Sequence, residues 1–86
     1  STAMNNLAEM YLRGWGVEKD LKKAVSLYQQ AADLQEPEAC YQLGRLYLQG
    51  EGVVRNMDEA RHWLNKARLL GFEKADQLYQ RLDEYF

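Results

Sequence analysis

Few residues in this sequence could carry out a chemical reaction. Cys40 is the single cysteine and His62 the single histidine, and they fall in different predicted helices. A catalytic thiol or hydroxyl needs a base at hydrogen-bonding distance, and Ser26, in the middle of a predicted helix, has no histidine at a suitable spacing. We interpret Cys40 as a packing residue and His62 as a solvated one. We therefore predict no catalytic residue. A small hydrolase or transferase that uses Cys40 is a third hypothesis, behind two that follow from the repeated pattern of the sequence.

Metal and cofactor chemistry is also not expected. One cysteine and one histidine cannot form a disulfide framework or an ordinary zinc site of the Cys/His type. Asp58 and Glu59 are adjacent in a helix, so their carboxylates point to different sides and do not form a catalytic pair. Their place in the first turn of a helix is explained by the helix dipole. We predict no metal and no cofactor.

Side chains suited to binding another protein recur at four-residue intervals, which places them along one stripe of a helix. Tyrosine and arginine are enriched at binding hot spots, so we predict that this stripe contacts a partner; the alternative is a mixed, solvated surface. The stripe consists of Asn5, Glu9, Arg13, Tyr41, Arg45, Gln49, Gln77, Arg81 and Tyr85. Trp15 lies between two turn glycines and either folds back onto its own repeat or forms an exposed anchor for a partner.

A repeat of 36 residues determines which elements position these side chains. Aligning residues 3–38 with residues 39–74 gives ten identities in 36 positions, mostly alanine, glycine or large apolar residues, where chance would give about two or three. We predict one domain over residues 1–86, with repeat one at 3–38, repeat two at 39–74 and a C-terminal capping helix at 75–86. Each repeat contains two helices, so the fold class is all-α with five helices.

The first helix of each repeat, helix A, has a predicted packed face that includes Leu7 and Tyr11, opposite the stripe. It ends at Gly14-Trp15-Gly16-Val17 or Gly50-Glu51-Gly52-Val53, where paired glycines can adopt left-handed conformations. The second helix, helix B, begins after an N-cap at Asp20 or Asn56. Gln35 stands where repeat two has Gly71, so we expect Pro37 to enforce the break between repeats.

The motif AxxxLxxxYLxGxGVxxDxxKAxxLYxxAA, from Ala3 to Ala32, resembles the Sel-one-like repeat, a relative of the tetratricopeptide repeat. Repeat two is similar, with AxxxLGxxYLxGxGV from Ala39 to Val53. The resemblance implies a right-handed α-solenoid of antiparallel helix pairs whose A helices line a concave surface. It also implies a non-enzymatic adaptor or scaffold that binds a protein or peptide.

Composition narrows the class of partner. Eleven Lys and Arg are dispersed among thirteen Asp and Glu, for a net charge of −2, so no continuous basic face for nucleic acid is expected. No apolar run reaches the roughly 20 residues that would cross a membrane. The polar first residues show no signal peptide, which favours a cytoplasmic location but leaves the compartment open. The second hypothesis is a fragment or capping segment of a longer array with a structural role.

Overall fold

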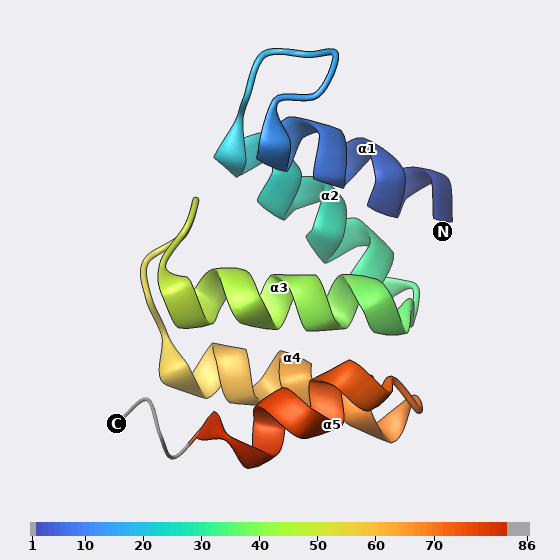
Figure 1. The fold of residues 1–86 in the computed structure, drawn as a ribbon, viewed down its shortest axis with the longest axis vertical. Helices are drawn as coiled ribbons and strands as arrows, with labels where there is room; N and C mark the ends of the chain where they lie inside the picture. The colour runs from blue at the N-terminus through green and yellow to red at the C-terminus, as the bar shows by residue number, and fades with distance from the viewer. Residues whose placement is uncertain (1, 83–86) are drawn as a thin grey trace.

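Five α-helices joined by short turns make up the described part of the chain, residues 2–82 of a computed structural model (Figure 1). No strand occurs within these residues, so the predicted all-α class with five helices is confirmed. The helices, in chain order, are α1 (Thr2–Arg13), α2 (Leu21–Asp33), α3 (Pro37–Gln49), α4 (Met57–Leu69) and α5 (Glu73–Gln80).

Each helix packs mainly on the helices before and after it in the chain. In Figure 1, α1 and α2 lie at one end of the long axis, α3 in the middle, and α4 with α5 at the other end. The dimensions, 35 × 24 × 17 Å, are those of a short stack of helices. Helices α1 and α3 are the A helices of the two repeats, α2 and α4 are the B helices, and α5 occupies the place of a third helix A.

The turns after α1 and α3 have the same backbone conformation, as the glycine spacing predicts. In both turns the amide of the first glycine donates to a carbonyl of the preceding helix at 2.8 Å: Gly14 to Met10, and Gly50 to Leu46. All four turn glycines have φ between 72° and 74°, in the left-handed region: Gly14, Gly16, Gly50 and Gly52. Two glycines per turn are needed because other residues rarely adopt this conformation.

The turns after α2 and α4 are also alike, although one of them lacks a glycine. Gly71 has φ 92°, and Gln35 has φ 68° at the equivalent place. A side chain in this region costs about 1–2 kcal/mol, so Gln35 is held there by its surroundings. Glu36 is extended and Pro37 begins α3, as predicted.

Side-chain caps fix where the B helices begin. The Asp20 carboxylate accepts from the Lys23 amide at 3.1 Å, and the Asn56 side-chain oxygen accepts from the Glu59 amide at 3.1 Å. Both predicted N-caps are therefore confirmed. The Glu59 carboxylate accepts from the indole N–H of Trp63 at 3.2 Å, which anchors the large aromatic ring of α4.

Small residues let the helices approach closely. A Cβ at Gly44 would lie 2.7 Å from Cγ of Leu64, so α3 and α4 meet at a distance that only glycine permits. The equivalent residue in repeat one is Ala8, which is fully buried. The core also contains one alanine row on each B helix, at Ala24 and Ala31 in α2 and at Ala60 and Ala67 in α4.

The predicted packed face of α1 is partly wrong. Leu7 is 39% exposed, whereas its equivalent Leu43 is completely buried. Ala3 is likewise exposed, and its equivalent Ala39 is buried. The difference arises because α3 packs against the preceding helix α2, and no such helix precedes α1 within the described residues.

Candidate partner-binding groove

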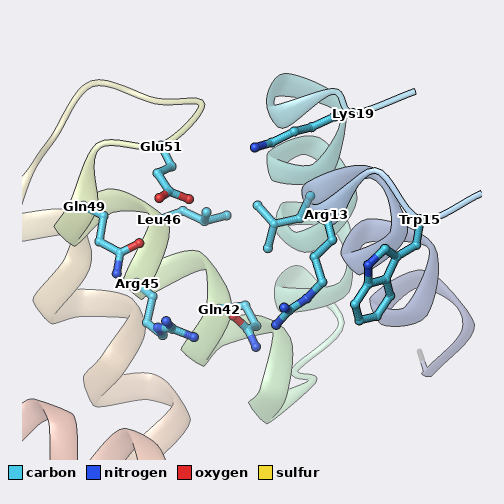
Figure 2. Close-up of a pocket in the computed structure, with 9 residues that line it drawn as sticks. Arg13, Trp15, Lys19, Gln42, Arg45, Leu46, Gln49 and Glu51 are labelled. Carbon is cyan, nitrogen blue, oxygen red and sulfur yellow. The ribbon is translucent and has the colours of Figure 1, made fainter. Parts of the chain in front are cut away.

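A groove runs between the end of α1 with its following turn and the neighbouring face of α3 (Figure 2). Its volume is about 460 Å³, and it opens to solvent. We call it the helix-A groove. Its lining residues are Leu12, Arg13, Trp15, Lys19, Gln42, Arg45, Leu46, Gln49 and Glu51. Both A helices and both glycine turns therefore contribute to one site.

Arg13, at the end of α1, is held on two sides. Its Nε lies 3.1 Å from a carboxylate oxygen of Glu9, one helical turn earlier, in an exposed ion pair. The guanidinium carbon lies 5.0 Å from the ring centroid of Trp15. Trp15 itself is 58% exposed. Two alternatives were expected for Trp15, a contact with its own repeat or an exposed anchor. The structure combines them, because the ring contacts Arg13 of its own repeat and still presents most of its surface to solvent.

Arg45, in α3, is oriented by an aromatic ring. Its guanidinium carbon lies 5.7 Å from the ring centroid of Tyr41, and the Tyr41 ring lies 5.1 Å from that of Phe72 in the turn before α5. Within residues 2–82 no carboxylate forms an ion pair with Arg45. Figure 2 shows the side chains of Arg13 and Arg45 directed toward Gln42, which lies between them.

A buried phenol lies close to both arginines. Tyr28 of α2 is almost fully buried. Burial, with the negative charges of Glu9 and Glu38, raises its pKa from 10.0 to about 12, and Arg13 and Arg45 oppose this shift. These charges are on α1 and α3, and α2, which carries Tyr28, packs against both of these helices. The phenol stays protonated at neutral pH and fills space between the helices.

The structure brings together four of the residues predicted to contact a partner: Arg13, Trp15, Arg45 and Gln49. Glu9 and Tyr41 support the two arginines from outside the groove lining. Gln77 and Arg81 are exposed at α5, away from the lining, and Tyr85 lies outside the described residues.

Asn5 is a correction, because its side chain is buried instead of forming part of an exposed stripe. It is 7% exposed, and its side-chain oxygen has no hydrogen-bond partner among the described residues. A buried amide oxygen of this kind destabilises the fold and cannot reach a partner.

Five residues that line the groove were not predicted from the sequence: Leu12, Lys19, Gln42, Leu46 and Glu51. Helical spacing contains a signal for part of this set, because Gln42, Leu46 and Gln49 follow one another at intervals of four and three residues. No comparable signal existed for Lys19 and Glu51, since turns have no periodicity.

The residues considered for catalysis are not arranged for it. Cys40 is fully buried, its thiol lies 3.9 Å from the carbonyl oxygen of Ala32, and burial raises its pKa. His62 is exposed on α4, with its ring against Trp63. In the described part of the chain no three His, Cys, Asp or Glu side chains form a group that could hold a metal ion.

None of the described helices has the length and apolar character needed to span a membrane.

Stacked helix pairs with superimposable glycine turns define an α-solenoid repeat protein. The family model of the Sel1 repeat matches residues 1–36 and 37–72, so this chain belongs to the Sel1 repeat family. The matched segments have the predicted period of 36 residues and begin two residues earlier than the predicted repeats. Proteins of this family are generally interaction scaffolds.

A solved Sel1 repeat protein from Oxalobacter formigenes is similar to this chain, with 40% identity and a TM-score of 0.89. The match covers 92% of this chain and 59% of the solved chain. The exopolysaccharide production negative regulator of Rhizobium meliloti is 44% identical over 85% of this chain and 29% of the regulator. The ERAD-associated E3 ubiquitin-protein ligase component HRD3B of Arabidopsis thaliana is 39% identical over 65% of this chain and 9% of that protein.

One relative has a name that refers to an enzyme. The putative beta-lactamase HcpC of Helicobacter pylori is 47% identical over 40 residues, which are 46% of this chain and 14% of that protein. This chain thus spans less than a third of the length of each of these curated relatives.

Proposed function

We propose that this chain is a non-enzymatic interaction module that holds a segment of another protein against the surface formed by its A helices. The observation that carries this proposal is the helix-A groove, where an exposed tryptophan and two arginines line one open cavity. Tryptophan and arginine are the residue types whose truncation most often costs a large part of the binding energy at protein interfaces. The volume is within the range of known ligand sites.

The comparisons support this reading at the level of the family. Sel1 repeat proteins are generally interaction scaffolds, and the HRD3B relative is named as a component of a ubiquitin ligase. The whole surface proposed for contact extends from the groove to Gln77 on α5 and to Arg81 just after it, and Tyr85 remains part of the prediction. No catalytic role is proposed, because Cys40 is fully buried beneath the helices and cannot be reached by a substrate.

Peptide selection from a random display library, followed by chemical-shift mapping on the labelled protein, tests the proposal. We expect the selected peptides to shift the amide signals of Trp15, Gln42 and Arg45. Trp15→Ala should weaken binding at least tenfold, as expected for a hot-spot aromatic residue. Leu69→Ala is the matched control, because Leu69 is also a large exposed apolar residue but lies on α4. Shifts confined to α2 and α4 would show that the A helices are not the binding surface.

A structural role within a longer array is the alternative function, and the exposed face of α1 favours it. Ala3 and Leu7 are open, whereas Ala39 and Leu43 are covered by the preceding helix B. Sedimentation across a range of concentrations and thermal melts separate the two functions. A monomer that melts cooperatively supports a self-contained module, and end-to-end association or a broad melt supports the structural role.

A further inference from the structure

The charges that line the helix-A groove differ in sign from the net charge of the chain. Three lining residues are cationic, Arg13, Lys19 and Arg45, and one is anionic, Glu51. The chain as a whole has a net charge of −2. A groove with an excess of positive charge attracts anionic groups to this place, although the protein as a whole is slightly negative.

Both arginines lie against aromatic rings and keep N–H groups available, although the Nε of Arg13 already donates to Glu9. A guanidinium that stacks on a ring uses its face for that contact and donates hydrogen bonds through its edge. The guanidinium carbon of Arg45 lies over the Tyr41 ring, 5.7 Å from its centroid, and that of Arg13 lies over the Trp15 ring at 5.0 Å. Because the rings restrict both side chains before binding, less conformational entropy is lost when an anion is bound.

Within residues 2–82, neither arginine is neutralised by a strong ion-pair partner. Arg45 has no ion pair among residues 2–82, and Arg13 is paired only with Glu9, where both side chains are well exposed. An exposed pair of this kind contributes little free energy, so an incoming carboxylate can share or replace it. Figure 2 shows both guanidinium groups directed toward the Gln42 amide. An anion at this point meets donors from α1 and from α3.

Glu51 makes the two ends of the groove differ in charge. Glu51, in the turn after α3, and Lys19, in the turn before α2, lie toward the end of the groove away from the two arginines and Gln42 (Figure 2). A carboxylate is therefore attracted most strongly at the arginine end, because Glu51 offsets the charge of Lys19 at the other end. Beside the arginines, the half-buried Leu12 and the exposed ring of Trp15 supply apolar surface. This combination suits an acidic side chain followed by an apolar one.

We propose that the helix-A groove selects an acidic peptide segment of the partner, with an Asp or Glu carboxylate bound between Arg13 and Arg45 and a neighbouring apolar side chain against Trp15. This inference rests on the proposed function and adds the chemistry of the partner to it. The carboxylate accepts hydrogen bonds from both guanidinium edges, and no covalent chemistry is involved.

The probe is a fluorescein-labelled peptide in which two glutamates flank a leucine, with both ends capped so that only side-chain carboxylates are tested. The matched peptide has glutamine in place of each glutamate. We expect the acidic peptide to bind at least tenfold more tightly by fluorescence anisotropy, and its affinity to fall as the salt concentration rises from about 50 to about 500 mM. Its binding should shift the amide signals of Gln42 and Arg45.

Variants of the protein distinguish a specific contact from general attraction. Arg45→Gln should reduce the affinity for the acidic peptide about tenfold and leave binding of the glutamine peptide unchanged. Lys22→Gln removes the same charge from an exposed residue of α2 outside the groove lining, and it should change the affinity less than twofold. Glu51→Gln should increase the affinity. A thermal melt of Arg45→Gln that matches the unmodified protein shows that its fold is intact.

Failure of this inference can be separated from failure of the proposed function. If the two peptides bind equally in the groove, or if Arg45→Gln and Lys22→Gln have equal effects, the acidic preference is wrong and the interaction surface stands. If peptides selected from the random library also leave the groove signals unmoved, the proposed surface is wrong as well. A short single-stranded oligonucleotide that displaces the acidic peptide with equal affinity would identify phosphate as the ligand and overturn the proposal.

Discussion

Replacing Gly52 with alanine should destabilise this protein far more than replacing Gly16, although the two glycines occupy equivalent places in the repeat. Both have φ of 74°, so both substitutions put a side chain into the left-handed region. Their surroundings differ. A Cβ at Gly52 would lie 2.8 Å from the carbonyl oxygen of Leu21 and 3.0 Å from Cγ2 of Val25. A Cβ at Gly16 would meet only the terminal methyl of Met10, at 3.7 Å.

These distances separate two contributions to the free energy of unfolding. The left-handed conformation costs about 1 kcal/mol for alanine relative to glycine at both positions. At Gly52 the added methyl also overlaps the backbone of α2, which is fixed by its own helical hydrogen bonds. Overpacking of this kind costs about 1–3 kcal/mol. We therefore expect Gly16→Ala to lose about 1 kcal/mol and Gly52→Ala to lose about 2–4 kcal/mol.

Urea unfolding followed by far-UV circular dichroism measures both values. For a chain of this size, 1 kcal/mol corresponds to about 4–8 °C in Tm, so a thermal melt resolves the difference as well. Valine at the same two positions should be worse in both cases and should keep the same order. Equal losses at Gly16 and Gly52 would refute the docking of the second glycine turn on α2, because only that contact distinguishes the two sites.

Three further predictions follow from the turns and the core. In urea titrations, Gln35→Gly should raise the free energy of unfolding by about 1 kcal/mol, because glycine adopts the left-handed conformation without cost. Gly71→Ala should lower it by a similar amount, because no atom lies within 4 Å of a Cβ at Gly71 and only the backbone conformation is strained. The pKa of Tyr28 is 10.0 in the unfolded chain and about 12 in the folded chain, so the protonated phenol favours the folded state. This contribution to stability is complete below pH 10 and is lost as the pH rises toward 12. The loss should be about 2–3 kcal/mol in alkaline unfolding measurements and should be absent in Tyr28→Phe. A thiol reagent should modify Cys40 only as fast as the chain opens, and rapid modification in native buffer would contradict its burial.

Local features of the fold could be predicted from the sequence because they depend on the conformation of one or two residues. The paired glycines of each repeat identify the ends of α1 and α3, and a proline at the first helical position identifies the start of α3. Asp20 and Asn56 identify the starts of α2 and α4 through their side-chain oxygens. In each case the signal is adjacent in sequence to the structure that it determines.

Burial could not be predicted as well, because it depends on which neighbouring helix covers each face. Helical spacing places Leu7 and Leu43 at equivalent positions, but only Leu43 is covered by a preceding helix B. Asn5 was predicted to lie on an exposed stripe and is buried. For the groove, spacing found Arg13 and Arg45 on their separate helices but could not find Lys19, whose position depends on the path of a turn.

Most of the positions that line the groove differ between the repeats, whereas the identical positions mainly build the fold. The identities include the turn glycines and buried alanines, which any repeat of this family needs for packing. Arg13 is equivalent to Gln49, Trp15 to Glu51, and Arg45 to Glu9, so the charge at each of these positions changes from one repeat to the next. Because the groove spans both repeats, Arg13 and Trp15 of repeat one and Arg45, Gln49 and Glu51 of repeat two line the same site. The same backbone repeated twice therefore forms an asymmetric site, with arginines at one end and Glu51 at the other.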